Sequence, residues 1–169
     1  MPKLGLSKWE EIVENFYAKY STLKAWQENN YKTVCKQGWY SVPTGRRFIF
    51  RKVRQWDGTL AYSWPSVCNY CVQSVATADV MPLVLVKLLP ELLEISKEIK
   101  LINQVHDSVI LDTPDVLVPV VAETCIRMFE RIPELMFEHY GWDWKTPMTG
   151  EVKYGNSWGA MTSYEREPF

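Results

Sequence analysis

The residues with the clearest chemical potential are His106 and Asp107, which stand side by side in the stretch LINQVHDSVILD, residues 101–112. The flanking runs are apolar and rich in β-branched residues, which favours two short strands. A carboxylate at the rim of a sheet is a good ligand for a hard divalent cation. A hairpin tip is also where polar groups escape burial, so ordinary turn residues are the competing interpretation. The tip has no Gly, Pro or Asn-Gly, however, so tight-turn chemistry does not explain the pair.

Two other metal chemistries compete with this one. The His-Asp dipeptide is typical of a class of metal phosphohydrolases, but these need several further histidines and the chain has only His139 besides His106. Cys68 and Cys71 form one CxxC pair, for which zinc would require two more ligands. The remaining cysteines, Cys35 and Cys125, and the two histidines show no paired spacing. We therefore interpret the CxxC pair as small buried thiols on a helix.

The composition predicts a compact soluble domain. The chain has 169 residues, a net charge of −1, 47% hydrophobic and 23% charged residues, a profile typical of one globular domain. No window reaches 18 uninterrupted apolar residues, and the first residues lack the features of a signal peptide. Four cysteines fit reduced thiols better than a disulfide framework. We expect a cytoplasmic protein with no membrane partner.

The near-neutral total hides an asymmetry of charge. Residues 1–60 carry a net charge of +6, whereas residues 61–169 carry −7. The basic part has its focus in GRRFIFRKVR, residues 45–54, where Arg46, Arg47, Arg51 and two further cations alternate with apolar side chains. Such a strand or hairpin would have one basic face suited to a nucleic-acid backbone. A solvated surface strand explains the same pattern equally well.

The elements that must position these residues alternate between helix and strand. A capping box of Ser7 and Glu10 begins a helix over about residues 8–30, whose apolar positions fall on one face. Residues 39–43 and 46–53 flank a Thr-Gly turn and predict a hairpin. A second helix covers about 66–93, with Pro82 bending or dividing it.

The second half supplies the strands around the His-Asp pair. We expect strands at 99–105 and 109–112, and then a helix that Thr113 caps, with Pro114 at its first position. This helix runs to about Tyr140 with an interruption at Pro133, and a last strand follows at 150–155. The pattern predicts an α+β fold in which an antiparallel sheet is packed by long helices.

These motifs jointly resemble DNA polymerase family A, the DNA polymerase I family. QVHDSVILD is similar to its catalytic motif C, a palm hairpin with His-Asp at the tip. GWYSVPTGRRF resembles its Gly-Arg-Arg segment, and NYCVQSVATADV, residues 69–80, resembles its Asn-x-x-x-Gln-x-x-x-Ala-Asp palm helix. GEVKYGNSW resembles its closing strand and Gly-x-x-Trp end. The four occur in the family's order and nearly its spacing over most of residues 8–160.

The resemblance implies roles for single residues. Asp107 would hold catalytic Mg²⁺ in a two-metal site, and His106 would lie near the terminal primer nucleotide. Asn69 and Gln73 are four residues apart and hence on one helical face. Their amides could test the minor groove of primer-template DNA, where every base pair shows an acceptor at nearly the same place. A polar helix face turned to water is the alternative for these two residues.

Departures from the family pattern narrow this expectation. Ser108 stands where many members have an acidic residue, and Trp64 and Pro65 replace a basic residue before the Asn-x-x-x-Gln helix. The 169 residues contain neither an Asp-x-Ser-x-x-Glu segment ahead of these motifs nor the fingers helix that grips the dNTP. The second carboxylate of the two-metal site is therefore expected from elsewhere.

We accordingly expect the C-terminal part of a DNA polymerase, with 1–60 in a fingers-like region and 61–169 in the palm. The chain would be one subunit of a split enzyme, as a bacteriophage gene could encode, working in the host cytoplasm with an N-terminal polymerase partner. Alone, it would be inactive. A non-catalytic DNA-binding remnant of a palm and an artificial truncation are the alternatives.

Overall fold

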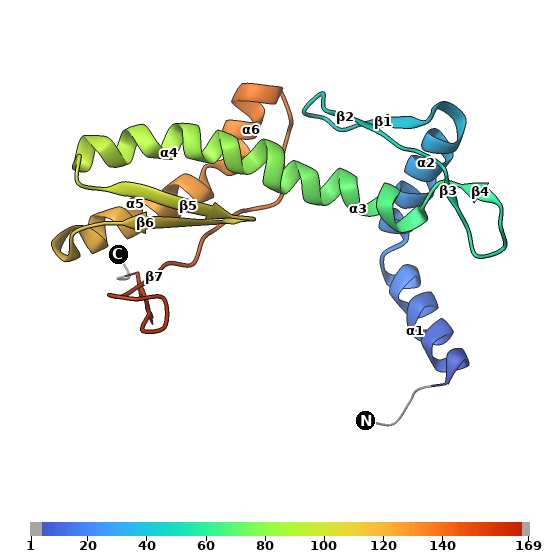
Figure 1. The fold of residues 1–169 in the computed structure, drawn as a ribbon, viewed down its shortest axis with the longest axis horizontal. Coiled ribbons are helices and arrows are strands. Elements are labelled where there is room, and N and C mark those ends of the chain that lie inside the picture. The colour runs from blue at the N-terminus through green and yellow to red at the C-terminus, as the bar shows by residue number, and fades with distance from the viewer. Residues whose placement is uncertain (1–4, 167–169) are drawn as a thin grey trace. The chain divides into compact units, whose positions relative to one another are not determined.

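The computed structural model describes residues 5–166 and divides into two compact units. Within the described residues, the first comprises 5–42 and 46–72, and the second comprises 43–45 and 73–166. Helices alternate with two-stranded antiparallel sheets (Figure 1), which confirms the predicted α+β class.

The N-terminal helical region consists of two helices where the sequence predicted one. Helix α1 covers Leu6–Lys19 and α2 covers Ser21–Gln37. Tyr20, with φ −113° and ψ 54°, breaks the run between them. The hydroxyl of Tyr17 donates a hydrogen bond of 2.9 Å to Oε1 of Gln27 and so ties the two helices together.

The predicted capping box is wrong. Ser7 lies inside α1, whose N-cap is Gly5, and no side chain caps the helix. No residue of α1 is buried, and its apolar side chains are largely exposed, among them Trp9, Val13 and Phe16. The regular apolar spacing therefore predicted the helix correctly without predicting burial.

Two short hairpins follow α2. Strands β1 (Trp39–Ser41) and β2 (Arg47–Ile49) pair as predicted around Thr44 and Gly45. Strands β3 (Val53–Arg54) and β4 (Leu60–Ala61) form the second hairpin.

The buried side chains of the first unit are few: Val34, Val42, Val67, Cys68, Cys71 and Asn30. Neither polar atom of the Asn30 amide has a hydrogen-bond partner within the described residues.

A continuous helical run crosses residues 64–95 but changes its winding. It consists of α3 (Trp64–Ser74), the π-helix η1 (Val75–Val80) and α4 (Met81–Ile95). Pro82 lies in the first turn of α4 and does not divide the run: the helix continues through it, and only the winding changes from π to α just before it. The Asn-x-x-x-Gln-x-x-x-Ala-Asp pattern that this helix resembles has three residues between Gln and Ala-Asp. In this chain four residues lie between Gln73 and Ala78. A π-turn, with its i→i+5 hydrogen bonds, accommodates such an extra residue within a helix.

The second unit has a well-packed helical core. Its buried apolar side chains come mainly from α4, α5 (Val118–Glu130) and α6 (Ile132–Tyr140), and they include Leu88, Leu92, Met128, Leu135 and Met136. By length and composition alone the run 64–95 could also span a membrane. Burial of one face of α4 against this core is the ordinary explanation, because core helices of soluble proteins pass the same test.

The start of α5 differs from the prediction, and its end agrees with it. Thr113 does not cap the helix: a 3₁₀ turn, η2 (Asp115–Leu117), precedes α5 with Pro114 as its N-cap, and the Thr113 hydroxyl is buried without a partner in the described structure. At the other end Arg131 separates α5 from α6, and Pro133 lies in the first turn of α6. The predicted interruption at Pro133 is thus confirmed.

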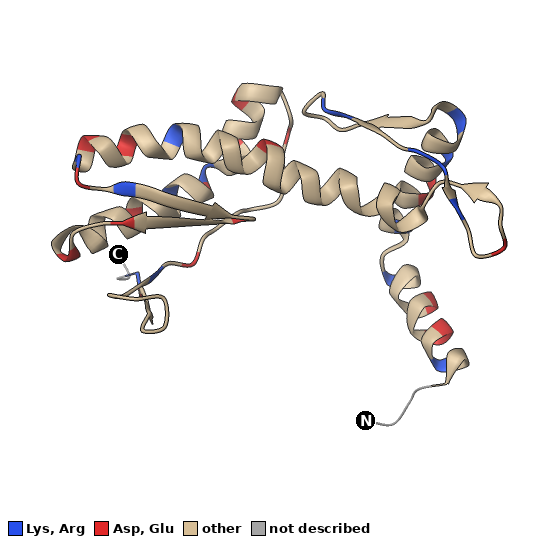
Figure 2. Ribbon diagram, viewed as in Figure 1, with Lys and Arg blue, Asp and Glu red and all other residues tan. Residues whose placement is uncertain are grey.

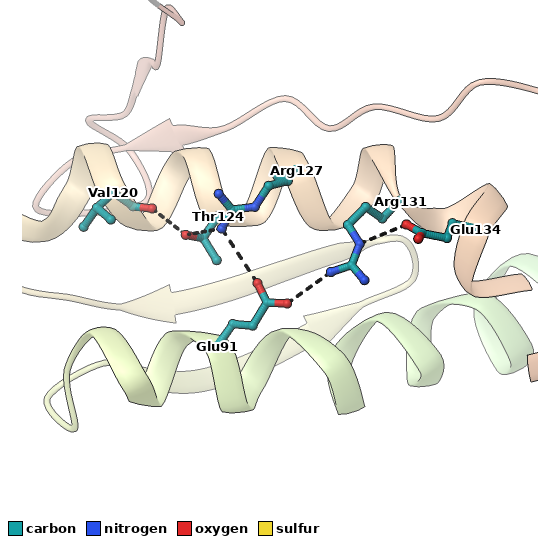
Figure 3. A network of polar contacts seen from close by, with 6 residues as sticks. All are labelled: Glu91, Val120, Thr124, Arg127, Arg131 and Glu134. Carbon is teal, nitrogen blue, oxygen red and sulfur yellow. Dashed lines mark hydrogen bonds and ion pairs between the residues drawn. The ribbon is translucent and has the colours of Figure 1, made fainter. Parts of the chain in front are cut away.

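Ion pairs join α4 to the following helices. Oε1 of Glu91 lies 3.3 Å from Arg131, and Oε2 lies 3.8 Å from Arg127 (Figure 3). Arg131 also contacts Glu134 at 3.2 Å. Such partly exposed pairs contribute about 0–1 kcal/mol each, so they fix the alignment of the helices more than they stabilise the unit.

The remaining strands belong to the second unit. Strands β5 (Lys100–Val105) and β6 (Ser108–Asp112) form the hairpin predicted around His-Asp. The predicted last strand is reduced to β7 (Lys153–Tyr154), which pairs with β8 (Thr162–Ser163). Arg166 anchors the segment after β8 to α5 through Glu123 at 2.9 Å and Glu130 at 2.8 Å.

Candidate active site at the tip of the β5–β6 hairpin

The hairpin turns through only two residues, His106 and Asp107, since Val105 pairs directly with Ser108. His106 has φ +54°. Among residues 5–166 it is the only residue other than glycine with a positive φ. A two-residue hairpin turn needs positive φ at its first central position, where glycine is usual. A side chain there costs of order 1–3 kcal/mol, and such strain is concentrated at functional sites.

Side chains next to the tip hold this turn in place. Nε2 of Gln104 donates a hydrogen bond of 3.0 Å to the carbonyl of His106. The hydroxyl of Ser108 donates one of 2.8 Å to the carbonyl of Val105. Ser108 therefore stabilises the turn through its hydroxyl group.

Asp107 lies at the edge of a groove of about 970 Å³ in the second unit. The hairpin forms one side, α5 a second, and the segment around β7 and β8 a third. Apolar side chains of α5 such as Val121 and Phe129 are part of the lining. The charged residues that line the groove are Asp107, Asp112, Asp115, Glu151 and Lys153.

The Asp107 carboxylate is available to a ligand. It is exposed and makes no hydrogen bond or ion pair with any residue among 5–166. Within the same residues, no group of three or more His, Cys, Asp or Glu side chains could hold a metal ion. The donor chemistry of Asp107 thus fits one ligand position for a hard cation.

The predicted minor-groove residues lie on α3. Asn69 and Gln73 are one helical turn apart, and both are exposed. Gln73 belongs to the same compact unit as the His-Asp hairpin, whereas Asn69 belongs to the first unit. Their role in contacting DNA remains a prediction.

The predicted basic residues lie in the first unit. Arg46, Arg47 and Arg51 are exposed, and Figure 2 shows the basic stretch running from β2 towards β3. The guanidinium carbon of Arg47 lies 4.1 Å from the centre of the Trp39 ring, a cation–π contact that orients this side chain. The exposed positions satisfy one requirement for phosphate contacts.

The two cysteines of the CxxC pair are buried thiols, whereas Cys35 is exposed. Cys68 and Cys71 are buried on α3, and burial, with a contribution from Cys68, raises the pKa of Cys71 to about 11. Burial also raises the pKa of Cys125, which lines the groove, to about 11. These two thiols are protonated at neutral pH, and the thiolate is the form that binds metal.

The carboxylate of Asp79 is buried, and the sequence alone indicated no role for it. Asp79 closes the Ala-Asp motif and accepts a hydrogen bond of 2.8 Å from the hydroxyl of Thr44, another residue of the second unit. The signal that could have revealed it is an acidic residue inside an otherwise apolar helical run, because buried carboxylates need partners.

The sequence comparison decides the family. Residues 3–160 match the model of DNA polymerase family A. The chain belongs to this family. It is 25% identical over 157 residues to DNA polymerase I of Caldicellulosiruptor bescii, a match covering 92% of this chain. It is 26% identical over 156 residues, 88% of the chain, to the thermostable DNA polymerase I of Thermus aquaticus.

The family A relatives are far longer than this chain. The matched region makes up 17% of each of these two polymerases and 16% of the thermostable DNA polymerase I of Thermus thermophilus, to which the chain is 27% identical over 154 residues. The chain thus corresponds to about a sixth of a family A polymerase.

Proposed function

We propose that this chain supplies the C-terminal part of a template-directed DNA polymerase, including one metal-binding carboxylate of its active site. The observation that carries the proposal is the strained two-residue turn of His106 and Asp107 in a chain of family A. Positive φ at His106 has a cost in stability that a simple turn would avoid with glycine.

Each predicted residue has a distinct part in this proposal. Asp107 holds Mg²⁺, and His106 lies beside the primer terminus. Asn69 and Gln73 donate hydrogen bonds to minor-groove acceptors, while Arg46, Arg47 and Arg51 contact the phosphate backbone. Residues 1–60 correspond to a fingers-like region and 61–169 to the palm.

Asp107 would hold Mg²⁺ together with carboxylates supplied by another segment or subunit. When bound, the metal pair stabilises the attacking hydroxyl and the leaving pyrophosphate during phosphoryl transfer. The contribution of this chain is to preorganise its carboxylate, since Gln104 and Ser108 fix the backbone of the turn. The groove beside Asp107 leaves space for such a segment.

A second candidate is a non-catalytic DNA-binding remnant of a palm. The exposed side chains of Arg46, Arg47 and Arg51 support it, because they could contact DNA without any chemistry at Asp107. In this case the basic surface persists and the carboxylate at the tip has no metal partner. A bacteriophage origin and a place in the host cytoplasm fit either candidate.

Complementation of primer extension separates the two candidates. The 169-residue chain is assayed with primer-template DNA, dNTPs and Mg²⁺, alone and with the product of a neighbouring gene that encodes the missing upstream motifs. We expect no extension from the chain alone and extension from the mixture. Extension by the chain alone would contradict the shared site, and inactivity of an assembled, DNA-bound mixture would favour the remnant.

A further inference from the structure

A basic hairpin with an exposed tryptophan follows the family's Gly-Arg-Arg segment, and only its first residue, Arg51, has a role in the proposal above. This Trp56 hairpin comprises residues 51–61. The side chain of Trp56 at its tip is 98% exposed. Two apolar side chains nearby in the sequence are also highly exposed, Ile49 at 79% and Leu60 at 62%. Single exposed apolar residues are common, but a group of them interleaved with cations is typical of a binding surface.

The turn that carries Trp56 is rigidly built. The amide of Gln55 donates to the carbonyl of Thr59 at 2.8 Å, and that of Gly58 donates to Gln55 at 3.0 Å. Gly58 has φ +84°, the left-handed conformation that closes a three-residue hairpin loop. Oδ1 of Asp57 accepts hydrogen bonds from the amide of Thr59 at 2.9 Å and from its hydroxyl at 2.7 Å. The backbone is therefore ordered before any ligand binds, which lowers the entropic cost of binding.

Charges divide the hairpin into two zones. Arg51, Lys52 and Arg54 are exposed along its base, where they can meet phosphates. Asp57 stands next to Trp56, and Figure 2 shows this acidic position at the tip of the β3–β4 hairpin. The hydrogen bonds from Thr59 lower the pKa of the Asp57 carboxyl, so it is ionised at neutral pH. The tip consequently repels phosphate and favours an aromatic, uncharged partner.

We propose that the Trp56 hairpin binds single-stranded DNA, with an unpaired base stacked on Trp56 and the neighbouring phosphates on Arg51, Lys52 and Arg54. Stacking on an aromatic side chain combined with a basic track is the general mode of single-strand binding. In a duplex the bases are enclosed between their neighbours, so the tip would find only the backbone that Asp57 repels. This inference rests on the DNA-binding part of the proposed function and adds a contact for the unpaired template.

Affinity and its salt dependence test the site. The full 169-residue chain is titrated into fluorescently labelled oligothymidine and into a blunt duplex at several NaCl concentrations. Trp56→Ala should weaken binding to oligothymidine about tenfold or more and change duplex binding much less. Because no cation is removed, the slope of log affinity against log salt should stay unchanged.

Three further variants sharpen the test. Trp56→Phe keeps an aromatic face and should retain most of the affinity. Neutralising Arg51, Lys52 and Arg54 together should reduce the salt slope by up to about 2, at ~0.7 for each phosphate contact on a single strand. Trp158→Ala is the matched control, because Trp158 is 69% exposed and lies in the other unit, and it should bind like the unmodified chain.

The outcomes distinguish this site from the proposed polymerase function. Equal oligothymidine affinity for Trp56→Ala and the unmodified chain would overturn the site, as would equal losses on single strand and duplex. So would failure of the unmodified chain to bind oligothymidine. Primer extension by the complemented enzyme is measured separately, and its success beside any of these results would leave the polymerase proposal intact.

Discussion

The two compact units of this chain differ in how they use apolar side chains. The second unit buries Leu88, Met128 and Met136 in a core shared by three helices, whereas α1 in the first unit buries nothing. The first unit contains nearly all of the basic N-terminal residues, and the second contains the hairpin with Asp107. A metal ligand needs accurate placement and is supported by a packed core. Phosphate contacts need less accurate placement, because electrostatic attraction acts over a longer range. A unit with a small core can therefore supply them.

The largest expected effect separates the cores of the two units. Leu88→Ala should lower the free energy of unfolding by about 2–5 kcal/mol, since it removes a buried side chain and leaves a cavity. Val13→Ala on α1 should change it by less than about 0.5 kcal/mol, because Val13 is half exposed. Chemical denaturation of the 169-residue chain measures both. Equal losses would mean that the exposed α1 face is buried in solution and would break the comparison.

The basic surface of the first unit should account for the salt dependence of duplex binding. Neutralising Arg46, Arg47 and Arg51 together should reduce the slope of log affinity against log salt by about 0.9 for each phosphate that the variant no longer neutralises. The drop in affinity should be similar for unrelated DNA sequences. Neutralising Lys87, Lys97 and Lys100 removes the same charge from the second unit and should leave the slope nearly unchanged. If both triples behave alike, only net charge matters and the basic segment is a solvated surface.

Gln73 tests whether α3 faces the minor groove at the primer end. Gln73→Ala should remove a hydrogen bond worth about 1 kcal/mol or somewhat more. Extension from a matched terminus should slow roughly tenfold for each ~1.4 kcal/mol lost, while extension from a mismatched terminus should change much less. Val72→Ala, a neighbouring exposed position on α3, is the control. Equal slowing on both termini would count against the minor-groove role.

The smallest effect concerns the backbone of the turn. His106→Gly places glycine where φ is +54°, so the free energy of unfolding should stay the same or rise by up to about 1 kcal/mol although a side chain is lost. Primer extension should nevertheless fall, because the variant lacks the imidazole that we propose to lie beside the primer terminus. A clear loss of stability in denaturation would show that His106 is a structural residue.

The sequence predicted those elements whose signals are local. Strand periodicity placed the hairpin around His106 and Asp107, and proline placed the interruption near Pro133. The break at Tyr20 has no Gly or Pro to mark it, and the helical periodicity continues through it. The π-turn at Val75–Val80 likewise has no composition of its own.

The sequence predicted the position of the His-Asp pair at the tip of a hairpin but not the surroundings of that tip. The His-Asp pair and its order among the motifs indicated the carboxylate at the tip. The positive φ of His106 could not be foreseen, because the side chain gives no hint of a glycine-like conformation. The groove beside Asp107 depends on α5 and on residues 149–162, which only the tertiary fold brings to the hairpin.

The most direct test of the central claim compares two carboxylates of the same groove. In an assembled enzyme that extends primers, Asp107→Asn should reduce extension by several orders of magnitude while DNA affinity stays nearly the same, because the variant lacks a metal ligand and keeps every cation that meets a phosphate. Asp112→Asn makes the same change of charge at the end of β6 and should stay within a few-fold of the unmodified enzyme. Full activity of Asp107→Asn, or equal losses for the two variants, would contradict the assignment of Asp107 as the metal-binding carboxylate.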